Sequence, residues 1–156
     1  MAGREKKARE ILRLRRALMR AEQTLAEAER ELLAGHQLCA SDFEILERLV
    51  RKGSDRVNAL APRVGLTSGS MTTAVQRLFK RGLVETRRDT QDKRVVWVEV
   101  TATGRELTAE LSLERAELLT AVFDDWSGRE QAILANLLKR VRKDSSAERL
   151  KGSPLG

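Results

Sequence analysis

The sequence of 156 residues contains one cysteine, one histidine, two prolines and no tyrosine. The single Cys39 excludes an intrachain disulfide, and a chain of this length can bury a core without covalent staples. Aromatic residues make up only 3%, which argues against an RNA-binding module that stacks bases on paired aromatic side chains. No apolar run approaches the ~18 residues of a membrane span, and the first residues lack the apolar stretch of a secretory signal. We therefore expect a cytoplasmic protein with no membrane partner.

The sequence also lacks the residue patterns of common catalytic and cofactor sites. It contains no G-x-S-x-G motif, no P-loop and no glycine-rich dinucleotide turn. His36 and Cys39 form an isolated pair, whereas metal sites normally use three or four ligands. We therefore expect no enzyme activity, no cofactor and no metal. Cys39 is expected to be a small packed or idle thiol, with a redox sensor as the alternative, because a sensor thiol needs a positive or helix-N-terminal environment.

The charge balance is basic, with 30 Lys and Arg residues against 23 Asp and Glu and a formal net charge of +7. Eight of the basic residues fall within the first 20 positions. A basic balance indicates a nucleic acid or an anionic surface as a partner, but does not choose between them. The 41% apolar and 34% charged fractions are typical of a helix-rich globular protein.

Helical spacing of apolar residues predicts a long first helix over about residues 8–34. Gly35 is expected to close this helix in the left-handed conformation. One face carries a heptad seam, which consists of Ile11, Leu14, Leu18, Ala21, Leu25, Ala28 and Leu32. The seam fits a core-facing stripe within one subunit and a dimerisation helix equally well.

Two further helices are expected next. Ser41 and Glu44 have the spacing of a capping box, so we expect Ser41 to cap the second helix. A short helix then covers about residues 57–64, where Pro62 removes one backbone donor and requires a short or distorted helix.

A fourth helix follows the turn at Gly65, is capped by Thr67 or Ser68, and runs to about Arg81. Its spacing places one apolar stripe toward the core, which consists of Met71, Val75 and Leu78. The opposite face is small or polar at its start and basic toward its end. That face presents Ser68, Gly69, Ser70, Thr72, Thr73, Gln76, Arg77 and Lys80.

Two β-rich runs, 83–88 and 95–100, flank a polar tip without glycine and predict a hairpin. Thr101 then starts a further helix, and Ser127 with Glu130 forms a capping box for the last one. The residues from Asp144 onward are polar with Gly and Pro, and we expect a flexible tail there.

The element order predicts a mainly α fold with a small β-hairpin wing. Two helices joined by a glycine turn, followed by a basic hairpin, indicate a winged helix-turn-helix. We expect four parts: residues 1–40 as an N-terminal dimerisation helix, 41–104 as the DNA-binding lobe, 105–143 as C-terminal dimerisation helices, and 144–156 as the tail.

The chemistry of the polar helix face fits double-stranded DNA. Its N-terminal end is slim enough for a major groove, and its hydroxyl and amide groups can read base edges. Arg77 and Lys80 on this helix, together with basic wing residues, can contact phosphates or a minor groove. The predicted wing contacts are Arg87, Arg88, Lys93 and Arg94. The alternatives are a protein–protein interaction module built on a coiled-coil dimer, or an architectural DNA binder without sequence preference.

Several short motifs in this order resemble the MarR family of bacterial transcription regulators. The resemblance covers about residues 41–104, and the flanking helices agree in number and place. The motifs are Leu60-Ala61, Gly65-Leu66-Thr67-Ser68, Arg77-Leu78, Gly82-Leu83-Val84, Asp92-x-Arg94 and Thr101-x-x-Gly104.

The resemblance implies a homodimer that binds a pseudo-palindromic operator, usually as a repressor. It implies release of DNA by a small aromatic or phenolic ligand, or by oxidation of a cysteine, and the sequence is most similar to a branch that responds to quinones, catechols or oxidants. It also implies that Arg94 enters the minor groove and that Asp92 braces the wing through a salt bridge. Thr86 and Lys93 stand where the family pattern usually has Arg, and Lys93 keeps the charge without the bidentate fork.

Overall fold

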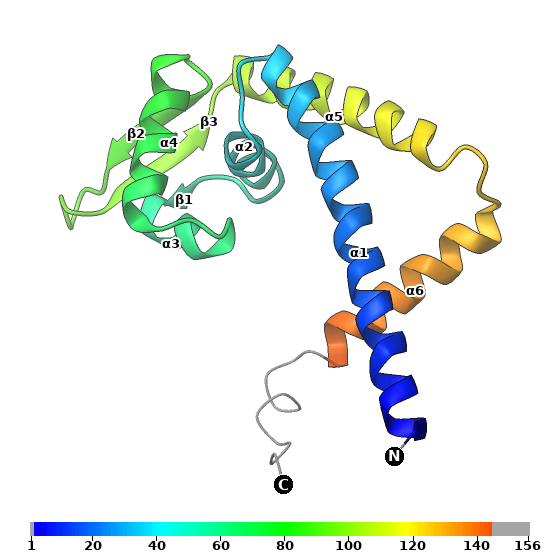
Figure 1. Cartoon of the computed structure of the whole chain (residues 1–156). Coiled ribbons are helices and arrows are strands. Elements are labelled where there is room, and N and C mark those ends of the chain that lie inside the picture. The colour runs from blue at the N-terminus through cyan, green and yellow to red at the C-terminus, as the bar shows by residue number, and fades with distance from the viewer. Residues whose placement is uncertain (1, 145–156) are drawn as a thin grey trace, which may run out of the picture. The chain divides into compact units, whose positions relative to one another are not determined.

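The computed structural model of the chain describes residues 2–144 and is mainly helical, with a small antiparallel sheet (Figure 1). The predicted fold class is confirmed. The helices and strands are α1 (Ala2–Gly35), α2 (Ala40–Lys52), β1 (Asp55–Arg56), α3 (Val57–Leu60), a 3-10 helix (Ala61–Arg63), α4 (Ser68–Lys80), β2 (Val84–Arg88), β3 (Val96–Val100), α5 (Ala102–Val122) and α6 (Gly128–Asp144).

The chain forms two compact units, residues 1–118 and residues 119–156, which are described separately. The first unit holds α1, the helix-turn-helix of α3 and α4, the sheet and most of α5. The second holds α6, where Ser127 Oγ accepts from the Glu130 amide and Glu130 accepts from the Ser127 amide, so the predicted capping box is confirmed. All of the expected tail after residue 144 lies outside the described residues. No helix within residues 2–144 combines the length and apolarity needed to cross a membrane.

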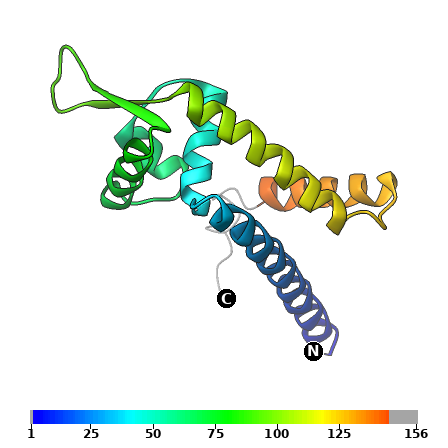
Figure 2. The same ribbon diagram turned by 90° about the horizontal axis from the view of Figure 1, so that it is seen from above.

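The sheet has three strands in the order β1-β3-β2, all antiparallel. The predicted hairpin is present, with Arg88 opposite Val96, and it projects from the helices of the lobe (Figure 2). The third strand was not predicted, because β1 is only the polar pair Asp55–Arg56, which has no alternating pattern of its own. It forms because Arg56 pairs with Trp97 of the central strand.

The core of the lobe is built by one face from each of its helices. Leu46 and Leu49 of α2, Met71 and Leu78 of α4, and Val98 of β3 are fully buried. Burying such a side chain contributes about 1.5–3 kcal/mol, so these contacts determine which side of α4 turns inward. The predicted core stripe of α4 is confirmed, as is the short helix with Pro62, which ends as a 3-10 turn.

Gly35 ends α1 as predicted, but the left-handed residue is Gln37, with φ 57°. The predicted cap of α2 is wrong. The cap of α2 is Cys39 rather than Ser41, because the carboxylate of Asp42 reaches back to the Cys39 amide at 3.2 Å. Residues 39 and 42 therefore take the capping positions that were expected at Ser41 and Glu44.

Gly104 near the start of α5 packs against the backbone of residue 83. A Cβ atom at this position would lie 2.1 Å from the Leu83 carbonyl oxygen and 2.8 Å from Val100 Cγ2. Both atoms belong to the sheet or its entry and cannot move aside without disturbing it.

We expect Gly104→Ala to lower the free energy of unfolding by about 2–3 kcal/mol, because the added methyl overpacks a rigid contact. Gly35→Ala is the matched control, since its Cβ would meet open space and alanine favours a helix. Urea unfolding followed by circular dichroism measures both. Equal stability of the two variants would contradict the close approach.

Candidate nucleic-acid interface

The outer face of α4 is set by its cap and by its buried stripe. Thr67 accepts a hydrogen bond from the Ser70 amide at 3.2 Å, so the predicted cap is confirmed, and Met71 and Leu78 fix the inner side. The polar residues predicted on the opposite side are all exposed and lie along one helix. They are Ser68, Gly69, Ser70, Thr72, Thr73, Gln76, Arg77 and Lys80.

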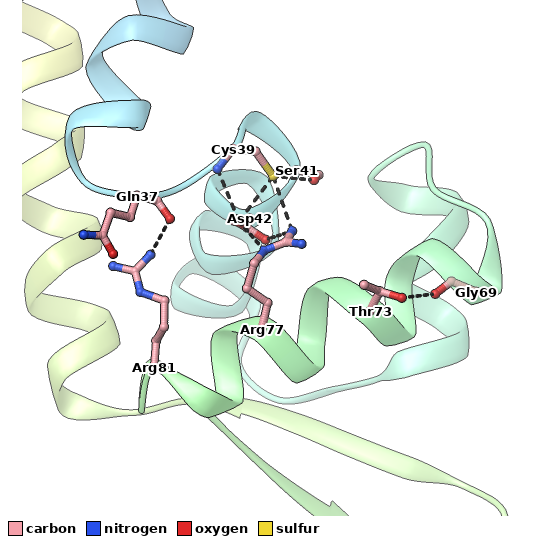
Figure 3. Close-up of polar contacts among 8 residues, drawn as sticks. All are labelled: Gln37, Cys39, Ser41, Asp42, Gly69, Thr73, Arg77 and Arg81. Carbon is pink, nitrogen blue, oxygen red and sulfur yellow. Dashed lines mark hydrogen bonds and ion pairs between the residues drawn. The ribbon is translucent and has the colours of Figure 1, made fainter.

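Two threonines on this face use their hydroxyl protons inside the helix. Thr72 Oγ1 donates to the Ser68 carbonyl at 3.0 Å. Thr73 Oγ1 donates to the Gly69 carbonyl at 3.2 Å (Figure 3). Each side chain therefore offers an outside partner its oxygen lone pairs and its methyl group. Such groups can accept from a base amine or contact a thymine methyl.

Arg77 differs from its neighbours because its guanidinium is already engaged. Its Nη2 and Nε donate to Asp42 at 2.6 and 3.0 Å, and Nη2 also lies 3.4 Å from Cys39 Sγ (Figure 3). The hydrogen bond to Asp42 raises the pKa of Arg77. The exposed Cys39 thiol also contacts Ser41 Oγ at 3.1 Å, so this cysteine belongs to the cap of α2 and not to the apolar core.

The predicted basic wing residues are all exposed. They are Arg87, Arg88, Lys93 and Arg94. Asp92 lies between them, and its Oδ1 accepts from Arg94 Nε at 3.2 Å and from the Arg94 amide at 3.0 Å. The Arg94 side chain nevertheless remains 91% exposed, which leaves it accessible to a partner.

The tip of the wing is anchored by Asp89 and Trp97, a contact that the sequence analysis missed. Trp97 Nε1 donates to Asp89 Oδ2 at 2.8 Å, and Asp89 Oδ1 accepts from the amides of Gln91 and Asp92. These bonds, above all the one from Trp97, lower the pKa of Asp89 to about 2.

The outer face of the sheet explains why Trp97 is held in place. Arg56 and Arg87 stand directly opposite Trp97 on the two neighbouring strands. Directly opposite residues share a face, and both guanidinium carbons lie over the indole, at 5.1 and 5.2 Å from its centre. Only the strand register brings this group together, and β1 was not predicted.

A groove of about 670 Å³ separates α4 from the wing. Thr72 and Gln76 line it from α4, while Arg56 and Arg94 line it from β1 and the wing. Two of the residues predicted for base reading and one predicted wing contact therefore border one shared hollow. Residues 76–94 carry seven Lys and Arg against three acidic residues, which gives this side of the lobe a positive potential.

Known proteins are similar to this chain in sequence and in fold. A model described as the MarR family matches residues 38–96. The HTH-type transcriptional regulator YkoM of Bacillus subtilis (strain 168) is 26% identical over 137 residues, or 88% of this chain and 89% of YkoM. The HTH-type transcriptional regulator MhqR of the same organism is 26% identical over 130 residues, or 83% of this chain and 90% of MhqR. A mutant MarR from E. coli complexed with operator DNA has 26% identity and a TM-score of 0.72, covering 85% of this chain and 95% of that one.

The fold, the exposed polar helix and the basic wing define a winged helix-turn-helix transcription regulator that binds DNA. The match to the MarR family model over residues 38–96, together with these relatives and solved structures, supports a MarR-type winged-helix regulator. The resemblance noted in the sequence is thereby confirmed. The relatives are transcriptional regulators and not enzymes, which agrees with the class predicted from the sequence.

We expect Asp89→Asn to destabilise the wing at neutral pH, because the amide accepts the Trp97 and backbone hydrogen bonds less strongly than the carboxylate does. The pKa of Asp89 in the folded chain, about 2, lies below its unfolded value of about 3.9. The stabilising contribution of Asp89 is therefore complete at a pH above its pKa in the unfolded chain. It is lost as the pH falls through its pKa in the folded chain.

Urea unfolding of both proteins between about pH 6 and about pH 3 tests this linkage. The stability gap between wild type and Asp89→Asn should be constant in the upper part of this range and should narrow below about pH 4. A gap that does not change with pH would show that the charged form of Asp89 is not favoured by folding.

Proposed function

We propose that the chain is a homodimeric, sequence-specific DNA-binding regulator that acts in the cytoplasm as a repressor. The observation that carries this proposal is the pairing of a slim, polar, exposed α4 face with a preformed basic wing across one groove. Base reading rests on Ser68, Gly69, Ser70, Thr72, Thr73 and Gln76. Phosphate and minor-groove contacts rest on Lys80, Arg87, Arg88, Lys93 and Arg94.

Exposed apolar residues on the long helices support the dimer. Ile11 and Leu14 of α1 are each 57% exposed, and Leu18 is 36% exposed, although all three belong to the heptad seam. Leu137 and Val141 of α6 are also exposed. Apolar rows of this kind mark interaction surfaces, so we assign residues 1–40 and 105–143 to dimerisation and residues 41–104 to DNA binding. Two α4 helices could then enter successive major grooves, about 34 Å apart, on a pseudo-palindromic operator.

Release from DNA is the regulatory part of the proposal. A small aromatic, phenolic or quinone-like ligand that binds better to a dimer with the wrong lobe spacing would shift the population off the operator. Oxidation of Cys39 is the second route, because its thiol is exposed and contacts Arg77 of α4. Cys39→Ser, which replaces the thiol at the cap of α2 by a hydroxyl that cannot be oxidised in this way, separates the two routes.

Fluorescence anisotropy with the DNA upstream of the gene, against a scrambled duplex, tests this function. We expect a preference of at least about 10³-fold near physiological salt, with two chains per duplex. Phenols, quinones and peroxide can then be screened for release in the same assay. Equal, salt-sensitive binding to both duplexes would instead favour an architectural DNA binder, and binding to neither would favour a protein–protein module.

Arg94→Ala should weaken binding to operator and scrambled duplex alike and should lower the dependence of log K on log salt by about 1.8, because each of the two subunits loses one phosphate contact. Gln76→Ala should instead relax the sequence preference and leave the salt dependence unchanged. Titrations at four or more salt concentrations measure both quantities. Wild-type affinity in Arg94→Ala would remove the wing from the interface.

A further inference from the structure

Two arginines at the C-terminal end of α4 point back into the lobe. Arg77 donates to Asp42 of α2 through Nε and Nη2. Arg81, one turn further, donates from Nη1 to the Gln37 carbonyl at 2.7 Å and from Nη2 to the His36 carbonyl at 2.9 Å. Figure 3 shows both side chains directed toward the junction of α1 and α2.

The Arg77 contact is strongly held, because its partner is buried. Asp42 is 1% exposed, whereas Arg77 is 43% exposed. A carboxylate without water must be paired, and removal of its partner costs several kcal/mol. The Cys39 amide also donates to Asp42, so the same carboxylate caps α2 and holds α4.

The Arg81 contact fixes a different segment. Its two acceptors are consecutive carbonyls in the turn where Gln37 takes φ 57°. Helix-ending carbonyls have no partner within their own helix, and a planar guanidinium can bind two of them at once. Arg81 therefore joins the end of α4 to the end of α1, while Arg77 joins α4 to the start of α2.

We propose that Arg77 and Arg81 are positioning residues for DNA binding, which set the angle of α4 instead of contacting phosphates. Arg77 is among the DNA contacts predicted from the sequence, but its hydrogen bonds to Asp42 favour a positioning role. The inference rests on the proposed function and assigns these two basic residues a role different from that of Lys80, which is exposed on the same helix.

A small tilt of α4 is enough to matter. Ser68 lies about 14 Å along the helix from Arg77, at 1.5 Å per residue. A tilt of about 10° at the clamped end would therefore move Ser68 by roughly 2 Å, whereas hydrogen-bond distances vary over only about 0.5 Å. A single contact would let α4 tilt about that point. The contacts of Arg77 with α2 and of Arg81 with the end of α1 together restrain this tilt.

Salt dependence separates a positioning residue from a phosphate contact. We would measure the affinity of Arg77→Gln, Arg81→Gln and Asp42→Asn for a duplex selected from a random library by the wild-type protein, over a salt series. Lys80→Gln is the matched control on the same helix. Circular dichroism and thermal unfolding check that each variant is folded.

We expect Arg77→Gln, Arg81→Gln and Asp42→Asn to bind the selected duplex at least about fivefold more weakly, with the wild-type salt slope. Lys80→Gln should instead lower the slope by about 1.8, because both subunits of the dimer lose one phosphate contact. Arg77→Gln and Asp42→Asn should be non-additive in a double-mutant cycle of binding free energy, since they break one ion pair. A drop in slope of about 1.8 for Arg77→Gln or Arg81→Gln, or full additivity of the cycle, would overturn the proposal.

Arg77→Lys keeps the proposal testable if Arg77→Gln does not fold. Lysine keeps the charge next to Asp42 and is itself a good phosphate ligand, but it cannot make the two-pronged contact. We expect this variant to bind DNA more weakly than the wild type, with the wild-type salt slope. Binding at wild-type affinity would overturn the positioning role of Arg77. A wild-type protein that selects no duplex would contradict the proposed function instead.

Discussion

The ion pair between Asp42 and Arg77 joins the start of α2 to α4, and the geometry of the lobe depends on it. The apolar contacts around it, such as Leu46 with its buried neighbours, supply most of the stabilisation, but hydrophobic attraction has no preferred direction. A buried carboxylate does have one, because its oxygens must meet specific donors or remain unpaired at a cost of several kcal/mol. The core therefore holds the helices together, and the contact of Asp42 with Arg77 restricts the direction in which α4 meets α2.

The wing follows a different principle, because it has little apolar surface to bury. Its tip contains no glycine, and Asp89 closes it by accepting from two backbone amides and from Trp97, as Asp does in local side-chain turns. Trp97 in turn lies beneath Arg56 and Arg87. The carboxylate of Asp89 thus holds the loop in one conformation through hydrogen bonds. The basic side chains of the wing stay at the surface, where a polyanion can contact them.

Periodicity made the helices and the hairpin predictable, because the spacing of Met71, Val75 and Leu78 admits only one inward face. Capping preferences predicted the start of α2 less reliably than periodicity predicted the helices. Residues 39–42 and 41–44 both have capping spacing, and cysteine is a rare cap, so sequence preference favoured the wrong pair. The contacts of Trp97, and those of Arg77 with Asp42 thirty-five positions away, depend on strand register and helix packing, which no local pattern encodes.

The junction between α1 and α2 also receives contacts from α5. Glu114 pairs with His36 at 3.2 Å, and Arg115 pairs with Glu29 of α1 at 2.9 Å and with Glu47 of α2 at 3.6 Å. These pairs are partly exposed, so each is worth no more than about 1 kcal/mol. Together they amount to about 1–3 kcal/mol, which is the size of typical coupling energies between sites. Arg81 of α4 holds the same junction, so α4 and α5 both contact the segment that links α1 to α2.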